Sequence, residues 1–500
     1  MTLRELATAV DGAHVQGDGA VRITAVTHDS RQVAPGTLFV ALPGRQMDGR
    51  HFISAALSKG AAAVGLPLDG DAPDGVPVLR MPAPRPDLAR LAARVMGDPA
   101  ERLTLVGLTG TNGKTTVSTL VARICRDAGR AEGLVGTISH WIAGQERPAA
   151  FTTPEAPALH SLFAEMVVAG VEIAVMEVSS IGLAEHRVHG LRFSAAGFLN
   201  LSVDHLDYHG DMAEYGSAKR RLFSEHVMSG GVAIVNIDDP YGHDLAEALR
   251  ESRPDVEVWS LSLTDATAEV RFLDLETDGR GTRGALQTPR GEVALDSPLL
   301  GRFNATNVAM AAAMALALGL PRDAVETSLA KSQVRGRMEA VANDVDLAIV
   351  VDYAHSPDAL ERVIATLQPL TEGTLWCVFG CGGDRDSTKR PAMGRAAAAA
   401  DAVVITNDNP RAEDPADIAA AALTGVERDR RLCTDGPTVG RTWVELDRRV
   451  AIRRTIAAAK PGDTILIAGK GHETYQEICG VQHPFDDVEE ARQALAEVST

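Results

Sequence analysis

The chain has 500 residues, which predicts about three domains, and 45% apolar side chains are enough for each domain to build a core. Its formal net charge of −18 argues against a nucleic-acid-binding protein, which needs a basic face. The five cysteines are scattered and odd in number, which argues against a zinc site. Free thiols of this kind suit a reduced cytoplasmic setting. The longest apolar run, Val308 to Leu318, is too short to cross a bilayer, so we expect no membrane association.

Residues 1–98 are expected to form a first, small α/β domain. Turn residues separate its short apolar runs, and one helix is expected at 52–59. Two of its loops combine hydroxyl or amide groups with arginine, which suits a nucleotide or diphosphate, although solvated loops look the same. These loops are Asp29–Arg31 and Arg45–Arg50. The expected strands are 21–26, 37–41, 61–65 and 76–81, and the Pro-rich tract 82–86 lies near the boundary.

The second domain, expected over residues 99–335, begins with a phosphate-binding pattern. The apolar run 103–108 is followed by TGTNGKTT at 109–116 and then by an amphipathic segment. A strand, a glycine-containing turn and a helix start in this order cradle phosphates. Lys114 can reach the β- and γ-phosphates, and Thr115 can ligate Mg²⁺. The strict pattern G-x-x-x-x-G-K-[ST] is missed because Leu108 occupies the place of its first glycine, but ATP binding is favoured over a structural turn.

Three further positions of the second domain can carry chemistry. Glu177 ends the apolar run 171–178 and is a natural magnesium ligand, although it could be an ordinary acid at a strand edge. His205 follows the run 195–201 and could be a ligand or an orienting group. Lys219 is followed by two arginines on a helix expected at 215–223, which predicts either a solvated basic face or a charged wall facing phosphate.

The third domain, expected over residues 336–500, alternates strands and helices. Such alternation predicts a parallel, Rossmann-like sheet with ligands at the carboxyl ends of its strands. The expected strands are 347–351, 374–379, 402–406 and 464–468, and the expected helices are 357–368, 389–400, 415–424 and 441–459. Polar loops follow the four strands, at 352–355, 380–386, 407–411 and 469–473, and we expect them to meet at one edge.

Taken together, these motifs resemble those of the Mur ligases, the ATP-dependent amino-acid ligases of peptidoglycan precursor synthesis. The resemblance covers essentially the whole chain and implies three α/β domains. Its motifs are TGTNGKTT, MEVSS, NLSVDHLDYHG, AKRRLF, GRFNATN, RGRME, DYAHSPD, GCGGDRD, DNPR and AGKGHE. The family's shorter loop form, G-T-N-G-K-T-T, accounts for the missing first glycine. The chain is most similar to members that extend UDP-N-acetylmuramoyl-L-alanyl-D-glutamate, and DNPR at 408–411 marks those that add meso-2,6-diaminopimelate rather than L-lysine.

The resemblance implies ATP and Mg²⁺ as cofactors and assigns residues to them. Lys219 matches a lysine that is carbamylated in the family, which turns a cation into an anion that holds a metal ion and replaces the charged wall inferred above. The implied catalytic residues are Lys114, Glu177, His205 and Lys219, and the implied metal ligands are Thr115, Glu177, His205 and carbamylated Lys219. The implied ATP-binding residues are Gly110, Thr111, Asn112, Gly113, Lys114, Thr115, Thr116, Asn304, Arg337 and Asp352.

Two further sets are implied for the other substrates. The set for the UDP-sugar is Ser30, Arg45, Gln46, Met47, Thr152, Thr153, Ser179, Glu185 and Arg187. The set for diaminopimelate is Arg385, Asp408, Asn409, Pro410, Arg411, Gly469 and Glu473. The chain departs from the family at Glu185, where glutamine is frequent, and at Ile181, where histidine is usual. Both departures concern individual contacts with the UDP-sugar, not the reaction.

The implied reaction is ATP-dependent amide-bond formation through an acyl phosphate, in a cytoplasmic protein that we expect to be a monomer. Its substrates would be UDP-N-acetylmuramoyl dipeptide and meso-diaminopimelate. Alternatives are the same ligase using L-lysine or L,L-diaminopimelate, or a ligase similar to folylpolyglutamate synthetase. A phosphate-loop switch or motor protein is the alternative from another class, but it leaves the polar loops of the third domain unexplained.

Overall fold

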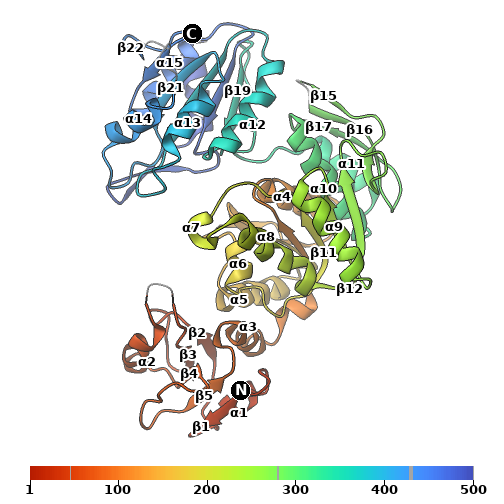
Figure 1. Ribbon diagram of the computed structural model, residues 1–500, viewed down its shortest axis with the longest axis vertical. Helices are drawn as coiled ribbons and strands as arrows, with labels where there is room; N and C mark the ends of the chain where they lie inside the picture. Colours follow the sequence, from red (N-terminus) through yellow and green to blue (C-terminus); the bar gives the residue numbers. More distant parts are fainter. Residues whose placement is uncertain (45–46, 279–280, 427–431, 499–500) are drawn as a thin grey trace. The chain divides into compact units, whose positions relative to one another are not determined.

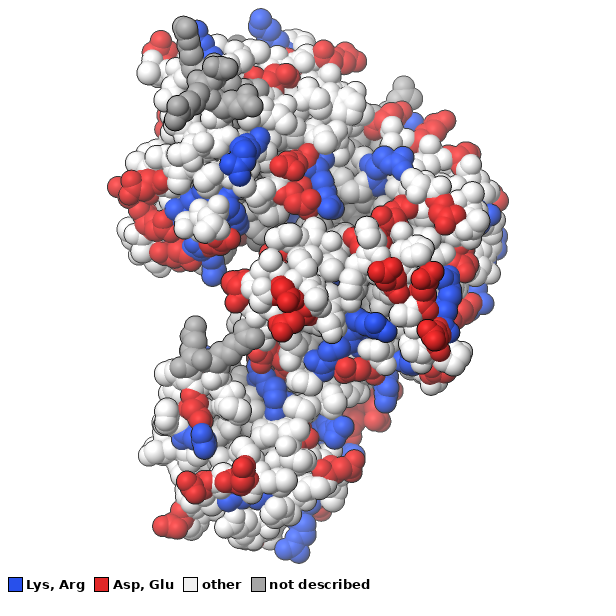
Figure 2. Space-filling model, viewed as in Figure 1, with Lys and Arg blue, Asp and Glu red and all other residues white. Residues whose placement is uncertain are grey.

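The structure is a computed structural model that describes residues 1–44, 47–278, 281–426 and 432–498 (Figure 1). These residues pack into two compact units. The first comprises Met1–Leu273, Ala285–Val293 and Thr306–Leu329, and the second comprises Asp274–Gly284, Ala294–Ala305 and Ala330–Thr500. On the face drawn in Figure 2, acidic and basic side chains are interspersed. Within the described ranges, no helix is long and apolar enough to cross a membrane.

A five-stranded sheet with the order β1-β5-β4-β3-β2 opens the first unit. Its strands are β1 (His14–Gln16), β2 (Ala25–Thr27), β3 (Thr37–Val40), β4 (Ala63–Pro67) and β5 (Val78–Met81). The helices are α1 (Leu3–Ala7), α2 (Ile53–Ser58, after a 3₁₀ turn at Gly49–Phe52) and α3 (Pro84–Val95). The expected helix at 52–59 is confirmed. The Pro-rich tract leads into α3, because Pro84 stands at the first helical position, where its fixed φ is favourable.

A larger sheet follows, with the order β15-β16-β14-β13-β12-β11-β6-β10-β7-β8-β9 and β17 paired to β16. The central strands β7, β10, β6, β11, β12 and β13 run parallel to one another. Their bounds are β6 (Thr104–Thr109), β7 (Glu132–Val135), β10 (Ile173–Glu177), β11 (Phe193–Phe198), β12 (Val227–Asn236) and β13 (Glu257–Ser262). The remaining strands are β8 (Ser139–Ile142), β9 (Gln145–Pro148), β14 (Val270–Phe272), β15 (Glu276–Asp278), β16 (Gly281–Gln287) and β17 (Val293–Ser297).

Helices lie along the chain between these strands. They are a 3₁₀ turn at Pro99–Arg102, α4 (Lys114–Asp127), α5 (Ala156–Val168), α6 (Ser180–Ala184), α7 (Leu206–His209), α8 (Met212–Arg221), a π-helical turn at Leu222–His226, α9 (Pro240–Ser252), α10 (Arg302–Ala317) and α11 (Arg322–Ala330). The register pairs Glu177 of β10 with Leu108 of β6, and Phe198 of β11 with Thr109. The carboxyl ends of β10 and β11 therefore flank the start of the phosphate-binding pattern.

The second unit is built on a seven-stranded sheet with the order β18-β19-β24-β20-β21-β23-β22. Its strands are β18 (Glu339–Val341), β19 (Ala348–Asp352), β20 (Leu375–Cys381), β21 (Ala402–Asn407), β22 (Leu432–Cys433), β23 (Thr442–Val444) and β24 (Thr464–Ala468). A separate hairpin contains β25 (Tyr475–Ile478) and β26 (Val481–Pro484). The helices are α12 (Pro357–Leu367, followed by a 3₁₀ turn at Gln368–Leu370), α13 (Arg390–Ala397), α14 (Pro415–Leu423), α15 (Arg448–Ala458) and α16 (Asp487–Val498).

Two apolar layers enclose this sheet. Alternate strand residues pack with α12, α13 and α14 on one face and with α15 and α16 on the other, as expected of a parallel sheet buried on both faces. The four strands expected in this region are confirmed, with small differences at their ends. The helix expected at 441–459 is wrong in its first part, because Thr442–Val444 pair as β23 beside β21 and the helix begins only after the capping residue Asp447.

A fully buried ion pair joins the two helices on the second face. The guanidinium of Arg448, at the start of α15, donates to the Asp487 carboxylate of α16 through Nε (2.7 Å) and Nη2 (2.8 Å), and both side chains are 0% exposed. The same guanidinium also donates to the carbonyl oxygens of Ala468 (2.9 Å) and Asn407 (3.3 Å), at the ends of β24 and β21. Arg448 therefore supports the loops that leave these two strands.

We expect Asp487→Asn to lower the free energy of unfolding of this unit by about 3–5 kcal/mol, because it leaves the buried guanidinium of Arg448 without its counter-charge. Urea unfolding measures the change. Glu497→Gln is the matched control, since Arg453 and Glu497 also join α15 to α16 but are 33% and 60% exposed, and it should cost less than about 1 kcal/mol. Equal losses in the two variants would contradict a special role for the buried pair.

Candidate functional site

The phosphate-binding pattern forms a tight turn between β6 and α4. Gly110 has φ +151° and Gly113 has φ +89°. A Cβ atom on Gly110 would lie 2.8 Å from the Cβ of Leu199, and one on Gly113 would lie 2.5 Å from Oδ1 of Asn307. The turn therefore requires glycine at both positions. Because Gly113 has no side chain to cap α4 and the first turn holds no acidic residue, the helix N-terminus is suited to an anion.

Two lysines donate to the same carbonyl oxygen of this turn. Lys114 Nζ lies 2.8 Å from the Gly110 oxygen and 3.0 Å from the Thr111 oxygen. Lys219 Nζ, from α8, lies 2.9 Å from the same Gly110 oxygen. Burial lowers the pKa of Lys219 well below its usual range, and the charge of Lys114 acts in the same direction, while Asp204 opposes them.

Lys219 is only 1% exposed, and its ammonium lies 4.4 Å from the ring centre of Tyr215. A solvated basic face is therefore wrong for Lys219. Of the two arginines that follow, Arg220 is exposed, and Arg221 pairs with Glu225 at 2.9 Å. The three cations consequently do not form one charged wall.

Glu177 brings a buried carboxylate to this turn. Its side chain is 0% exposed, and Oε2 accepts from the hydroxyls of Thr115 (3.1 Å) and Thr137 (3.0 Å). Oε1 accepts from the backbone N–H of Thr137 (2.9 Å). A threonine hydroxyl and a carboxylate are oxygen donors of the kind that Mg²⁺ prefers, so the expected ligands Thr115 and Glu177 do lie together.

His205 occupies a separate loop after β11. It has φ +54°, and its side chain is 48% exposed, with Nε2 lying 3.5 Å from Asp204 Oδ2. Burial lowers its pKa, and Asp204 partly offsets this. The loop is attached to the phosphate turn, since Thr111 Oγ1 donates to the Ser202 carbonyl at 3.2 Å. No described contact joins His205 to Glu177, and in the described ranges no three His, Cys, Asp or Glu side chains form a metal-binding group.

The residues expected at the UDP-sugar form a connected network around Thr153. Its hydroxyl donates to the Glu177 carbonyl (2.9 Å) and accepts from the Ser179 N–H (3.0 Å), and its own carbonyl accepts from Arg187 (2.9 Å). Thr152 is joined to the surroundings of Glu177, because its hydroxyl lies 2.9 Å from that of Thr137, which donates to Glu177.

Ion pairs connect this network to α3. Arg85 pairs with Glu155 (3.2 Å) and with Glu185, whose other carboxylate oxygen accepts from Tyr208. Arg187 also pairs with Glu155, at 2.8 Å. Sequence reasoning missed Arg85 and Glu155, because an arginine in a proline-rich tract and an acid before a helix carry no recognisable motif.

The first sheet contributes less to this network. Ser30 follows β2 and is half-buried, and Met47 is 63% exposed. His28, two residues before Ser30, brings Nε2 to 3.9 Å from Glu155. Arg45 and Gln46 lie outside the described residues.

Of the expected ATP-binding residues in the second unit, Asp352 and Asn304 are buried and Arg337 is half-buried. Asp352 Oδ2 accepts from the Met338 N–H (2.7 Å) and Oδ1 from the Ala354 N–H (2.8 Å). Burial raises its pKa, while the charge of Arg337 opposes the change. The guanidinium of Arg337 lies 4.7 Å from the ring centre of Tyr353. Asn304 is 2% exposed and donates to the Leu300 carbonyl at 2.9 Å.

The polar loops of the second unit meet at the carboxyl edge of its sheet, as predicted, because β19, β24, β20 and β21 are parallel neighbours. Lys470 Nζ donates to Asn409 Oδ1 (3.0 Å) and to Glu473 Oε2 (3.1 Å), and Asn409 Nδ2 donates to Glu473 Oε2 (2.8 Å). Lys470 is 0% exposed and 3.6 Å from Asp408. Sequence reasoning did not predict Lys470 as a site residue, although it lies between the two glycines of the AGKGHE motif.

Arg411 also lies at this edge of the sheet, on the loop after β21. Its Nη1 donates to the Gly383 carbonyl (2.8 Å), which joins the loops after β20 and β21. Pro410 precedes it and is buried. Gly469 has φ +115° and donates its N–H to the Asp352 carbonyl at 3.0 Å. Arg385 is exposed on the neighbouring loop.

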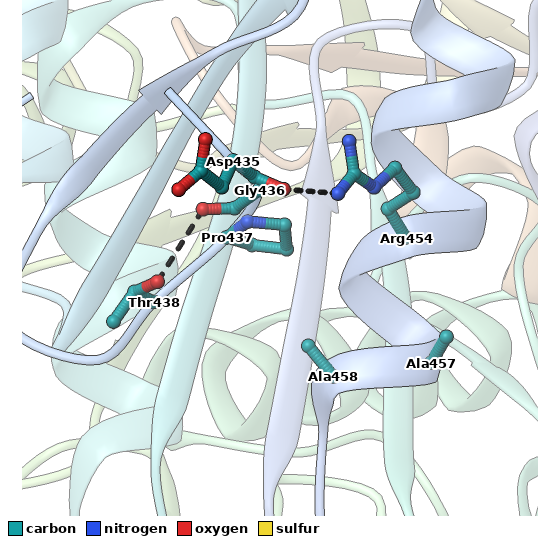
Figure 3. Close-up of a pocket in the computed structure, with 7 residues that line it drawn as sticks. All are labelled: Asp435, Gly436, Pro437, Thr438, Arg454, Ala457 and Ala458. Carbon is teal, nitrogen blue, oxygen red and sulfur yellow. Dashed lines mark hydrogen bonds between the residues drawn. The ribbon is translucent and has the colours of Figure 1, made fainter. Parts of the chain in front are cut away.

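A cavity of about 320 Å³ lies elsewhere in this unit (Figure 3). Figure 3 shows Arg454 of α15 reaching a carbonyl of the segment before β23. That segment approaches the amino end of β21, since Gly440 donates to the Asp401 carbonyl. The cavity is therefore at the edge of the sheet opposite the polar loops. Its lining residues are Asp435, Gly436, Pro437, Thr438, Arg454, Ala457 and Ala458.

Comparison with known proteins identifies the family. Residues 22–95 match the Mur ligase family catalytic domain, 108–315 the Mur ligase middle domain and 336–471 the Mur ligase glutamate ligase domain. A relative from Gloeobacter violaceus, a UDP-N-acetylmuramoyl-L-alanyl-D-glutamate–2,6-diaminopimelate ligase, is 44% identical over 99% of this chain and 98% of its own. The chain belongs to the Mur ligase family.

Solved structures agree with this assignment. A UDP-N-acetylmuramoyl-L-alanyl-D-glutamate–2,6-diaminopimelate ligase structure has a TM-score of 0.72 and 34% identity, covering 100% of this chain and 99% of the other. A Mycobacterium tuberculosis folylpolyglutamate synthase complexed with ADP and AMPPCP has a TM-score of 0.62 at 21% identity, covering 81% of this chain and 93% of the other, which shows a shared fold. The expected three-domain α/β fold of the Mur ligases is confirmed. The expected domain boundaries stay a prediction, as do the roles of the individual site residues.

Thr137 is a residue of this Mur ligase that sequence reasoning missed. The sequence did contain one signal for this residue: Thr137 lies shortly after the run that forms β7, and β7 pairs with β10. We expect Thr137→Val to reduce ATP-dependent activity about tenfold or more and to raise the Mg²⁺ concentration required, because the buried Glu177 carboxylate loses a hydroxyl donor worth about 1.5–3 kcal/mol. Steady-state rates at several Mg²⁺ concentrations measure both effects. Thr137→Ser keeps the hydroxyl and should retain activity; equal behaviour of the two variants would contradict this role.

Proposed function

We propose that this protein joins meso-2,6-diaminopimelate to the D-glutamyl carboxylate of UDP-N-acetylmuramoyl-L-alanyl-D-glutamate with the hydrolysis of ATP, in peptidoglycan precursor synthesis. Family membership and the full-length similarity to ligases of that name support the reaction. The observation that supports the choice of amino acid is Arg411 at the carboxyl edge of the second unit's sheet, linked to the loop after β20.

The phosphate turn is suited to the triphosphate of ATP. Residues 110–116 would surround the phosphates with backbone N–H groups, and Lys114 would exchange its carbonyl contacts for phosphate oxygens. Asn304, Arg337 and Asp352 would hold the adenine, a phosphate and the ribose. Thr115 and Glu177 fit Mg²⁺ because their side-chain oxygens lie only 3.1 Å apart. His205 and carbamylated Lys219 would be the remaining metal ligands. Mg²⁺ would screen the repulsion between the triphosphate and the attacking carboxylate.

The reaction then needs two transfers. The D-glutamyl carboxylate attacks the γ-phosphorus, which forms an acyl phosphate and releases ADP. An amine of diaminopimelate attacks the acyl carbon and loses a proton, and the tetrahedral intermediate expels phosphate. Lys114 stabilises the negative charge that builds up on the transferred group. The predicted UDP-sugar contacts, from Ser30 to Arg187, would place the carboxylate beside the phosphate turn.

The residues at the edge of the second sheet would select the amino acid. Arg411 can form a charge-assisted pair with the second carboxylate of diaminopimelate, which lysine lacks. Asp408, Asn409 and Glu473 supply acceptors for ammonium groups, and the backbone at Pro410 and Gly469 shapes the loops around them. Arg385 supplies a further cation for a carboxylate. We also propose that the protein acts in the cytoplasm as a monomer; all five of its cysteines are free thiols, which suits a reducing compartment.

The direct test supplies the purified protein with UDP-muramoyl dipeptide, ATP and a panel of amino acids. ADP release should require an amino acid, and kcat/KM for meso-diaminopimelate should exceed that for L-lysine by about ten- to a hundred-fold, the value of one charge-assisted hydrogen bond. Equal use of lysine or L,L-diaminopimelate would favour the alternative amino acids. Activity with a folate substrate instead would favour a folylpolyglutamate-synthetase-like ligase, and ATP hydrolysis without any amino acid would favour a switch or motor protein.

We expect Lys219→Ala to abolish most of the activity and a short-chain carboxylic acid to restore part of it. The acid would supply the negative charge that the carbamate provides, in the space vacated beside Gly110. The measurement is the amino-acid-dependent rate with and without added acid. Arg220→Ala, which removes the exposed neighbouring cation, is the control and should be neither inactive nor rescued. An inactive Lys219→Ala enzyme that no carboxylic acid rescues would contradict carbamylation.

A further inference from the structure

The hairpin β25–β26 holds the main chain of Arg411. The Arg411 N–H donates to the Glu477 carbonyl (3.0 Å), and the Arg411 carbonyl accepts from the Cys479 N–H (2.7 Å). Arg411 has φ +52°, a left-handed conformation that is unfavourable for a residue with a Cβ atom. Because both of its backbone polar groups are bonded to the hairpin, the hairpin keeps this conformation in place.

The same strand also contacts the residues just before Arg411. Gln476 Nε2 donates to the Asp408 carbonyl (2.8 Å), and the Glu477 N–H donates to Asn409 Oδ1 (2.9 Å). β25 therefore supports the loop 408–411 along most of its length. Sequence reasoning assigned no role to this hairpin.

One side chain of β25 orients the guanidinium itself. Glu477 Oε2 lies 3.2 Å from Arg411 Nε, and the two side chains are 27% and 21% exposed. Arg411 Nη1 is bonded on the other side to the Gly383 carbonyl at 2.8 Å. The ion pair with Glu477 on one side and the hydrogen bond to Gly383 on the other restrict the orientation of the guanidinium, and they leave N–H groups of Nη1 and Nη2 to meet a carboxylate.

We propose that Glu477 is a specificity-determining positioning residue, which holds the Arg411 guanidinium in the orientation that receives the second carboxylate of diaminopimelate. The proposal rests on the proposed function. Glu477 acts through Arg411 and does not touch the substrate. Fixing a flexible side chain before the ligand arrives removes an entropic cost from binding, so the loss of Glu477 should weaken diaminopimelate binding without affecting ATP.

An alternative role for Glu477 predicts the opposite change in diaminopimelate binding. If Glu477 only neutralised Arg411, its removal would leave a more strongly positive site, and diaminopimelate would bind more tightly. The two explanations therefore predict changes of opposite sign in the KM for diaminopimelate.

The test compares steady-state constants of Glu477→Ala, Glu477→Gln and the wild type. Glu477→Ala should raise the KM for diaminopimelate about tenfold, because the guanidinium must then be ordered when the ligand binds, while kcat and the KM for ATP stay within about twofold. Its kcat/KM for L-lysine should not change, so the preference for diaminopimelate over lysine should fall about tenfold. Glu477→Gln keeps the size of the side chain but loses the charge of the ion pair, so its KM for diaminopimelate should lie between those of the wild type and Glu477→Ala.

Gln482→Ala is the matched control, because Gln482 is the exposed cross-strand neighbour of Glu477 in the hairpin. It should behave like the wild type, and thermal unfolding should show that all variants fold. Arg411→Ala supplies a second control: Glu477→Ala should have no further effect in that background, because the two residues act as one unit.

A KM for diaminopimelate that is unchanged or lower in Glu477→Ala would overturn the proposal, as would full additivity with Arg411→Ala or an equal increase in the KM for ATP. These outcomes require a wild type that uses diaminopimelate, and they leave the proposed function intact. A wild type that does not use diaminopimelate would instead contradict the proposed function, and this inference with it.

Discussion

Two ammonium groups share the carbonyl oxygen of Gly110, and the chemistry of the central site depends on this arrangement. Lys114 arrives from the start of α4 and Lys219 from α8. Two cations on one acceptor repel each other, and burial removes the water that would otherwise screen them. The turn therefore favours a negative group beside it. A triphosphate on the helix N-terminus, or a carbamate in place of the Lys219 ammonium, each satisfies that requirement.

Parallel strands place the remaining groups where this charge can be used. Glu177 reaches the turn because β10 pairs with β6 in register, and its carboxylate is oriented by Thr115 and Thr137. In the second unit the same topology collects four polar loops at one edge. Arg448 donates to the carbonyl groups at the start of two of them and is itself held by a fully buried ion pair with Asp487. The candidate site residues on these loops are thus held in place by buried, rigid elements.

The residues around Thr153, which are predicted to contact the UDP-sugar, are held by a network of ion pairs. Arg85 of α3 forms ion pairs with Glu155 and Glu185, and Arg187 joins Glu155 to the carbonyl of Thr153. Glu185, which the resemblance marks as a departure from the family, has a cationic partner in Arg85. Its partly buried carboxylate is favourable because a guanidinium and a tyrosine hydroxyl bind both of its oxygens.

The sequence by itself determined the four central strands of the second unit's sheet, the strands that lead to the phosphate turn, to Glu177 and to the loop of His205, and the edge at which the polar loops meet, because periodicity, glycine spacing and helix caps act locally. Its family resemblance also identified the reaction. Three-dimensional packing alone decided that Lys219 is buried, that residues 442–444 form a strand rather than a helix, and that α3 begins in the proline tract. It likewise decided which residues support the site: Thr137, Arg85, Lys470 and Glu477 become important only through partners that are distant in the chain, or through burial. Such roles depend on what lies beside a residue after folding, and spacing along the chain does not contain that information.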